Sequence, residues 1–312
     1  MILALRALGV GDLVTAVPAL RGLRAAFYGE PLALAAPAWL TPLIELIGGV
    51  GRIVPTDGLT LHRWDIERPR LAVNLHGRGP ESHRLLHAAA PESLWAFANA
   101  EADHLDGPEW TEEEHEVQRW CRLLRHYGVT CDETDMSLAV PDRSAPRGVT
   151  IVHPGAKVPA RRWPADRFAA VARQLREAGH QVVITGSVSE QDLRVRVAER
   201  AGLPASALPS TGLAELAALV AHARLVISGD TGIAHLATAY GTPSVTLFGP
   251  MSPARWGPPD RPYHRSIWHG TRSEPGDRPG PDVHPALLAI GEREVLDAVT
   301  EVSAASHLMS KL

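Results

Sequence analysis

The chain has 312 residues, of which 45% are hydrophobic and 21% charged, and a net charge of −4. This is the balance of a globular protein with room for two domains. No apolar run approaches the roughly 18 residues that a membrane-spanning helix requires. The apolar start from Met1 to Leu5 is followed, not preceded, by the first basic residue, Arg6, whereas a secretory signal carries its charge in front. We therefore expect a buried first strand and a cytoplasmic protein.

Short apolar runs alternate with longer helical patterns along the first half of the chain. This alternation predicts a parallel sheet covered by helices on both faces. The predicted strands are Ile2–Leu5, Leu32–Ala35, Arg52–Val54, Leu71–Leu75 and Ser93–Phe97. The predicted helices are Leu13–Phe27, Leu40–Ile47, Glu81–Ala89 and Glu112–Tyr127.

The same pattern restarts at Val149, after a polar, proline-rich segment at 141–148 that reads as a linker. The predicted strands are Val149–Val152, Gln181–Thr185, Leu225–Ser228 and Ser244–Phe248. The predicted helices are Pro164–Ala178, Glu190–Ala201, Leu213–Ala221, Ile233–Ala239, one near His284–Ile290 and Arg293–Val302. Residues 258–285 form the longest irregular stretch.

These patterns predict an α/β fold of two doubly wound, Rossmann-like lobes, residues 1–145 and 149–312, with a cleft between them. Ligands of such sheets bind at the carboxyl ends of the strands. The last helix is expected either to stay with the second lobe or to pack back on the first. Residues 1–145 carry 13 Arg and Lys against 20 Asp and Glu, a net charge of −7, and the remainder carries +3. A basic second lobe suits an anionic ligand, and an acidic first lobe argues against nucleic acid.

A glycine-rich turn, Gly9-Val10-Gly11-Asp12, directly follows the first predicted strand. It is not a dinucleotide fingerprint, because a third glycine would be needed where Val14 stands. Asp12 is expected at the start of a helix. There it is either a helix cap or a general base that accepts a proton from a substrate hydroxyl.

The segment Ser228-Gly229-Asp230-Thr231-Gly232 ends a strand and opens a helix that carries His235 one turn in. Unpaired backbone N–H groups at such a helix start favour an anion, and Gly232 has no side chain to obstruct it. The alternative is a capped helix with a buried histidine.

Two further loops follow strands of the second lobe. His153-Pro154-Gly155-Ala156-Lys157 runs into Arg161-Arg162-Trp163-Pro164, a basic cluster suited to phosphate or a solvated loop. Thr185-Gly186 leads to Glu190. That carboxylate either accepts a hydrogen bond from a ribose hydroxyl or is an ordinary acid of the first helical turn.

No metal site is expected. His83 and His87 are four residues apart and could share a helix face, but no acidic or thiol partner is evident. The two cysteines, Cys121 and Cys131, lack metal-ligand spacing and are expected to be free thiols.

Taken in order, these motifs resemble glycosyltransferase family 9, the ADP-heptose-dependent heptosyltransferases. The matching features run along nearly the whole chain: Gly11-Asp12 with Pro18 downstream, His153-Pro154-Gly155, Arg161-Arg162-Trp163-Pro164, Asp230-Thr231-Gly232 with His235, and Phe248-Gly249-Pro250. One departure is Arg161, where the family usually has lysine, which keeps the charge but changes its geometry.

The resemblance implies a GT-B fold and a metal-independent enzyme without a cofactor that inverts the anomeric carbon, with an ADP-sugar as co-substrate. Asp12 would be the base. The implied donor-binding residues are Gly155, Ala156, Lys157, Arg161, Gly186, Glu190, Asp230, Thr231, Gly232 and His235. Among these, Lys157, Arg161 and His235 would offset the negative charge of the leaving group, and Asp230 would contact the transferred sugar. The acceptor-binding candidates are Gly11, Asn74, His76 and Arg78.

The acidic first lobe favours a neutral or cationic soluble acceptor, such as an amino sugar or aminocyclitol of antibiotic biosynthesis. The alternative acceptor is the phosphorylated inner core of lipopolysaccharide. A nucleotide-sugar epimerase and a non-catalytic nucleotide-sugar binder are the alternatives to a transferase. The partners expected are therefore a sugar donor and a small-molecule or glycolipid acceptor.

Overall fold

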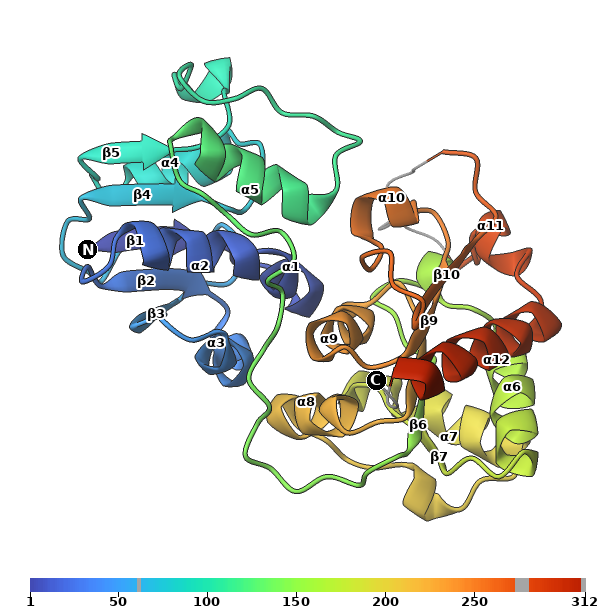
Figure 1. The fold of residues 1–312 in the computed structure, drawn as a ribbon. Helices are drawn as coiled ribbons and strands as arrows, with labels where there is room; N and C mark the ends of the chain where they lie inside the picture. The colour runs from blue at the N-terminus through green and yellow to red at the C-terminus, as the bar shows by residue number, and fades with distance from the viewer. Residues whose placement is uncertain (61–62, 273–280, 310–312) are drawn as a thin grey trace. The chain divides into compact units, whose positions relative to one another are not determined.

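The computed structural model describes residues 1–60, 63–272 and 281–309. It divides the chain into two compact units, Met1–Ala139 and Val140–Leu312, and each unit contains one five-stranded sheet (Figure 1). Every strand pairing in both sheets is parallel. The prediction of two parallel α/β lobes is therefore confirmed. The boundary between the units lies just before the segment 141–148 that the sequence marks as a linker.

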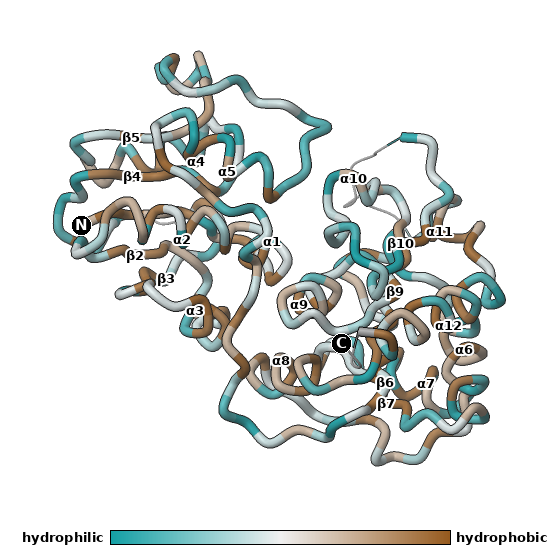
Figure 2. The backbone as a smooth tube through the Cα atoms, in the orientation of Figure 1, coloured by the Kyte–Doolittle hydropathy of each residue, from teal (hydrophilic) through white to brown (hydrophobic). Residues whose placement is uncertain are grey.

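The first lobe has the strand order β3-β2-β1-β4-β5. Its strands are β1 (Ile2–Leu5), β2 (Leu32–Ala36), β3 (Arg52–Pro55), β4 (Leu71–Asn74) and β5 (Ser93–Trp95). Its helices are α1 (Val10–Thr15), α2 (Val17–Ala26), η1 (Ala38–Leu40), α3 (Thr41–Ile47), α4 (Glu81–His87), η2 (Ala100–Ala102) and α5 (Glu116–His126). Strands β1, β2 and β4 are buried throughout, and β2 and β4 are coloured as hydrophobic segments in Figure 2. Helices α2 and α5 pack side by side, and α4 packs against β4 (Figure 1).

The second lobe has the strand order β10-β9-β8-β6-β7. Its strands are β6 (Thr150–His153), β7 (Val182–Ile184), β8 (Leu225–Gly229), β9 (Ser244–Phe248) and β10 (His264–Trp268). Its helices are η3 (Pro159–Arg161), α6 (Ala165–Glu177), η4 (Val188–Glu190), α7 (Gln191–Ala201), η5 (Ala205–Ala207), α8 (Leu213–Ala221), α9 (Gly232–Tyr240), α10 (Pro253–Trp256), α11 (Pro285–Leu288) and α12 (Glu292–Met309). Helices α8 and α9 lie on one face, and α6, α7 and α12 on the other (Figure 1).

Two helices of the first lobe begin more than one residue away from the predicted start. The helix predicted over Leu13–Phe27 begins earlier, at Val10, and is split at Ala16 into α1 and α2. Pro18 explains the split, because it has no N–H to continue the hydrogen-bond ladder and is tolerated only in the first turn of the new helix. The helix predicted from Glu112 begins at Glu116, where the Nδ1 atom of His115 accepts a hydrogen bond from the N–H of Val117 at the helix start.

The end of the chain also differs from prediction. Strand β10 falls within the stretch predicted to be irregular, of which residues 273–280 lie outside the described part. This strand is at the sheet edge, and only Ile267 of its five residues is buried, so it lacks the apolar run that marks a central strand. Helix α12 extends beyond the predicted Arg293–Val302 and packs against α6, β9 and β10 of its own lobe.

Candidate functional site

Each sheet has a switch point, where the connections leaving two neighbouring strands run in opposite directions and a crevice opens at the carboxyl ends. In the first sheet, β1 leads to β2 on one side and β4 leads to β5 on the other, so the switch point lies between β1 and β4. In the second sheet it lies between β6 and β8 by the same argument. Three of the sequence motifs follow strands at these switch points, with Asp12 after β1, Gly155 after β6 and Asp230 after β8, whereas the Gly186 loop follows the edge strand β7.

Asp12 is the third residue of α1, not its cap. The cap residue is Gly9, and its backbone N–H donates to Oδ2 of Asp12 at 3.1 Å. The other carboxylate oxygen, Oδ1, lies 3.3 Å from Nη2 of Arg6. The side chain of Asp12 remains 27% exposed. The expectation that Asp12 is the helix cap is therefore wrong. Its carboxylate instead accepts a hydrogen bond from the cap residue and remains partly exposed at the switch point.

Arg6 directly follows β1, and no motif in the sequence marked it as part of a site. Its guanidinium is fully buried and also binds Oε1 of Glu116 at 3.2 Å. Glu116 in turn forms an ion pair with Arg119, whose side chain is 1% exposed. No spacing rule predicts this network, because Arg6 and Glu116 are brought together only by the packing of α5 on the first lobe.

The candidates after β4 have different surroundings. Asn74 is fully buried, and its amide nitrogen lies 2.9 Å from Oγ of Ser82 and 3.1 Å from Nδ1 of His83. The amide thus organises the loop and does not face solvent. Arg78 is more exposed and pairs with Glu112 at 3.4 Å.

His76 is the candidate after β4 that is hydrogen-bonded to the loop following β1. Its Nδ1 accepts from the backbone N–H of Ala7 at 3.3 Å, so a neutral ring carries its proton on Nε2. Burial, assisted by the positive charge of Arg6 and opposed by Asp12, lowers the pKa of His76 to about 4. The ring is therefore neutral at physiological pH and able to donate one hydrogen bond. The fourth acceptor candidate, Gly11, is a half-exposed residue within α1.

In the second lobe, α9 begins directly beyond the switch point. Its cap residue is Thr231, whose side chain makes no capping hydrogen bond. Its hydroxyl points back to the carbonyl of Gly229 instead, at 3.4 Å. The first N–H groups of a helix have no intrahelical acceptor, so those of Gly232 and Ile233 are available to an anion. His235 is buried on the same helix, with its ring 5.8 Å from that of Trp256.

Arg161 and Asp230, expected to act separately, form an ion pair. Nη2 of Arg161 lies 3.0 Å from Oδ2 of Asp230 and also donates to the backbone carbonyl of Asp230. The two side chains are 23% and 9% exposed. The pair holds a guanidinium beside the start of α9, so each residue determines where the other lies.

Trp163 fixes the other end of the Arg161 loop. Its buried indole donates to the carbonyl of Ile290 at 3.1 Å. Within the loop, Lys157 is exposed, whereas Ala156 is buried and its carbonyl accepts from Nε of Arg162 at 2.8 Å. The basic cluster is thus a positioned loop rather than a freely solvated one.

The turn at Gly155 approaches Glu190 closely. A Cβ atom on Gly155 would lie 2.2 Å from Oε1 of Glu190, and one on Gly186 would lie 3.2 Å from Oε2. Oε2 accepts from the N–H and the hydroxyl of Ser187, both at 2.8 Å. Glu190 is therefore a first-turn acid of the ordinary kind, but one whose carboxylate lies against the Gly155 loop.

His153 belongs to the same loop. It shares a hydrogen bond with the hydroxyl of Thr185 at 3.0 Å. Burial lowers its pKa to about 4, although the charge of Glu190 acts in the opposite direction. His153 is therefore neutral at physiological pH and adds no charge to an anion site.

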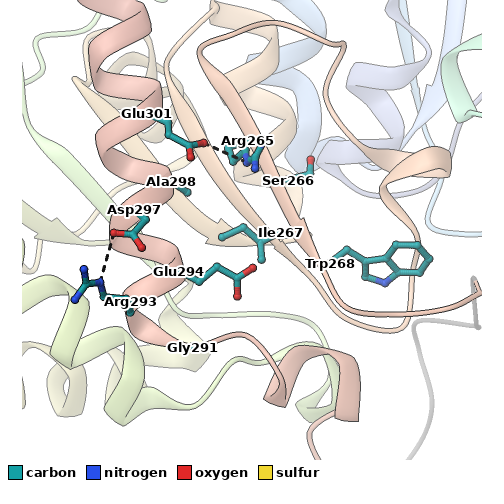
Figure 3. Close-up of a pocket in the computed structure, with 10 residues that line it drawn as sticks. All are labelled: Arg265, Ser266, Ile267, Trp268, Gly291, Arg293, Glu294, Asp297, Ala298 and Glu301. Carbon is teal, nitrogen blue, oxygen red and sulfur yellow. Dashed lines mark ion pairs between the residues drawn. The ribbon is translucent and has the colours of Figure 1, made fainter.

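A cavity of about 560 Å³ lies elsewhere in the second lobe, between β10 and α12 (Figure 3). Its charged lining is paired within the cavity wall, as in Arg265 with Glu301 at 3.5 Å and Arg293 with Asp297 at 3.6 Å. None of the site residues that the sequence predicts lines this cavity. Within the described ranges there is no group of three or more metal-ligating side chains, and Cys121 and Cys131 are free, buried thiols.

The sequence model of glycosyltransferase family 9 (heptosyltransferase) matches residues 107–275, more than half of the chain. Lipopolysaccharide heptosyltransferase 2 of Salmonella typhimurium is 27% identical over 286 residues, which cover 78% of this chain and 81% of the relative. Lipopolysaccharide heptosyltransferase 3 of Escherichia coli K12 is 29% identical over 208 residues, which cover 60% of this chain and 59% of the relative.

Solved structures share the fold over nearly the whole chain. The E. coli ADP-heptose lipopolysaccharide heptosyltransferase II aligns with a TM-score of 0.77 at 23% identity, covering 98% of this chain and 99% of that one. The E. coli heptosyltransferase WaaC with ADP aligns with a TM-score of 0.71 at 17% identity, covering 96% and 99%.

Two parallel-sheet lobes of this kind are the GT-B fold, which these heptosyltransferase structures share. The chain belongs to glycosyltransferase family 9, the heptosyltransferases. Its family and its heptosyltransferase relatives identify it as a glycosyltransferase. In the described part of the chain, no helix is both long and apolar enough to cross a membrane.

Proposed function

We propose that this enzyme transfers a heptose-like sugar from an ADP-sugar to a hydroxyl of the lipopolysaccharide inner core, without a metal and with inversion at the anomeric carbon. The choice of acceptor rests on one observation: the relative that aligns along most of both chains is a lipopolysaccharide heptosyltransferase. The donor class is supported by two fold neighbours, one named for ADP-heptose and one solved with ADP.

This proposal adopts the alternative acceptor in place of the soluble cationic one, which the comparisons do not support. The net charge of the first lobe is a weak guide to the acceptor, because it does not say where the excess acids lie. Several acids also lie in ion pairs with arginines of the same lobe. Pairs of this kind are Glu30 with Arg70, Glu112 with Arg78, Glu114 with Arg122, Glu116 with Arg119, Glu133 with Arg125 and Asp135 with Arg21. A lobe-wide sum therefore does not report the charge that an acceptor meets at the carboxyl edge of the sheet.

In the proposed donor site, the diphosphate lies at the N-terminus of α9. Backbone N–H groups of Gly232 and Ile233 meet it there, together with the guanidinium that Asp230 holds in place. Gly155 leaves room for the backbone of its loop to approach the ligand. Lys157 supplies a second cation from the same loop. The carboxylate of Glu190, next to Gly155, is the proposed acceptor for a ribose hydroxyl.

In the proposed reaction, Asp12 removes the proton from the acceptor hydroxyl while that oxygen attacks the anomeric carbon. The bond between the anomeric carbon and the β-phosphate oxygen breaks, and ADP leaves with the electron pair. A single displacement inverts the anomeric configuration. The charge that develops on ADP is offset by Arg161, Lys157 and the start of α9, which is the electrostatic stabilisation that a metal supplies in other transferases. The proton on Asp12 then passes to solvent.

The variant Asp12→Asn tests the base. It keeps the shape of the side chain but removes proton acceptance, so we expect transfer to fall at least about 100-fold while calorimetric ADP affinity stays unchanged. An Asp12→Asn enzyme that transfers at the rate of the unaltered enzyme would refute the assignment.

The acceptor is tested by presenting a deacylated inner-core oligosaccharide and an aminocyclitol to the enzyme with ADP-heptose. We expect a glycosylated product by mass spectrometry with the oligosaccharide alone. Product from the aminocyclitol only would contradict the acceptor while leaving the donor and the base in place.

A further inference from the structure

A chain of four charged side chains runs from the surface into the core of the first lobe. It begins at Asp12, which is 27% exposed, and continues through Arg6, Glu116 and Arg119, which are 0%, 6% and 1% exposed. The charges alternate and sum to zero. The only member that reaches solvent appreciably is the proposed base.

The buried members are held from several sides. Arg6 donates to the carbonyls of Leu75 at 2.6 Å and Asp12 at 2.9 Å, and its guanidinium lies 4.6 Å from the ring centre of Trp120. Arg119 donates to three carbonyls of the segment before α5, those of Thr111, Glu112 and Glu114. The network thus has little freedom to rearrange.

Stability alone is a weak explanation for such a network. Removing charges from water is costly, and apolar residues of similar volume often replace a buried ion pair without loss. The same packing of α5 on the first lobe is already provided by aromatic contacts, such as the ring of Trp120 6.0 Å from that of Phe97. What apolar residues could not supply is a fixed charge at the inner side of Asp12.

The positive charge that Arg6 presents to Asp12 depends on both carboxylates that Arg6 binds, those of Asp12 and Glu116. A guanidinium paired with Asp12 alone would favour the ionised carboxylate strongly and make it a poor proton acceptor. Glu116 binds the same nitrogen, Nη2, and so shares that positive charge. His76 also interacts with Asp12, and its ring is neutral at physiological pH because burial lowers its pKa to about 4.

We propose that Glu116 is a positioning residue for the proposed base: it fixes the guanidinium of Arg6 and divides its charge, so that Asp12 is oriented yet still accepts a proton. This inference rests on the proposed role of Asp12. It assigns to α5, far along the chain from the Gly11-Asp12 turn, a part in setting the pH range of the reaction.

The test is the pH dependence of kcat/KM in the variant Glu116→Gln. Without the negative charge of Glu116, Arg6 acts on Asp12 alone, so we expect the acid limb of the profile to move to lower pH by about one unit. We also expect kcat at neutral pH to fall by about 10-fold because the base is weaker. ADP affinity, measured by calorimetry, is expected to stay unchanged.

Glu114→Gln is the matched control. It removes the same charge two positions away, from a glutamate paired with Arg122 and not with Arg6. We expect it to leave the acid limb in place. An equal shift in both variants, or none in Glu116→Gln, would overturn the inference.

Two further variants keep the test decisive if Glu116→Gln folds poorly. Glu116→Asp retains the charge and is expected to retain the position of the acid limb even at reduced stability. In Arg119→Gln, Glu116 loses its second arginine partner, so its negative charge acts on Arg6 alone. We therefore expect the acid limb of the profile to move to higher pH. The opposite signs separate a charge effect from a structural defect, and a limb that stays fixed in Arg119→Gln counts against the inference.

Failure of the inference is distinguishable from failure of the proposed function. If Asp12→Asn transfers normally, the base is misassigned and the inference falls with it. If Asp12→Asn is inactive and the acid limb of Glu116→Gln does not move, Asp12 remains the base and only the role of Glu116 is refuted.

Discussion

The ion pair between Arg161 and Asp230 allows a quantitative test of the proposed donor site through the variant Arg161→Met. A unit charge about 5 Å from a phosphate charge contributes about 3 kcal/mol at an effective dielectric constant of about 20. The carboxylate 3.0 Å away offsets part of that charge, and the side chain is 23% exposed. We therefore expect ADP binding to weaken by about 1–2 kcal/mol, or about 5- to 30-fold in Kd.

The assay is calorimetric titration with ADP, and two variants control for the fold and for net charge. Arg161→Met leaves Asp230 without its partner, so a loss of stability is expected as well. The double variant Arg161→Met/Asp230→Asn removes that unpaired charge and should recover stability without recovering ADP affinity. Arg176→Met removes a charge from the last turn of α6, at the end of the sheet away from the switch point, and should leave ADP binding unchanged.

Arg161→Lys provides the last comparison. It keeps the charge in the form usual for the family and should bind ADP within a few-fold of the unaltered enzyme. The reasoning is refuted if Arg161→Met binds ADP as tightly as the unaltered enzyme, or if Arg176→Met weakens binding as much.

Two predictions concern stability. Ser228 and Ser244 are both buried, but the Ser228 hydroxyl has no partner among the described residues whereas that of Ser244 lies 2.9 Å from Nδ1 of His264. In urea unfolding, Ser228→Ala should be neutral or stabilising and Ser244→Ala destabilising by about 1 kcal/mol; the reverse order would contradict the assigned hydrogen bonding. Burial lowers the pKa of His153 and of His264 to about 4 each, so the unfolded chain binds more protons between about pH 6.5 and 4. The free energy of unfolding should therefore fall as pH decreases through that window, by about 1 kcal/mol per histidine at pH 5 after allowance for partial exposure, and a value unchanged between pH 7 and pH 5 would show that these rings are not buried in their neutral form.

Much of the fold could be predicted because parallel α/β lobes leave a strong local signal. The strand Ile2–Leu5 is buried on both faces, so it appears in the sequence as a continuous apolar run with the bounds observed. Edge strand β10 has one buried residue and left no such signal. Helix starts were predicted less well, because caps such as Gly9 and His115 depend on local hydrogen bonds rather than periodicity.

In the candidate site, too, some features could be predicted from the sequence and others could not. The motifs around Asp12, Gly155 and Asp230 were located from the sequence because each follows a strand end, and the topology then places them at the two switch points. Their partners were not predicted. Arg6 was noted only as the basic residue after the first strand, Glu116 was placed in a helix without a role, and Arg161 and Asp230 were given separate roles.

The sequence by itself determined the two-lobed α/β fold, the family and the positions of the loops that follow the strands, because these depend on hydrophobic periodicity and on residues adjacent in the chain. Only the tertiary structure decided which charges meet. Arg6 forms an ion pair with Glu116, which is 110 positions away in the sequence. Arg161 forms one with Asp230, which is 69 positions away. An ion pair depends on the distance between two side chains in space, which composition and net charge do not contain. A lobe-wide charge of −7 therefore could not report the charge around a particular site.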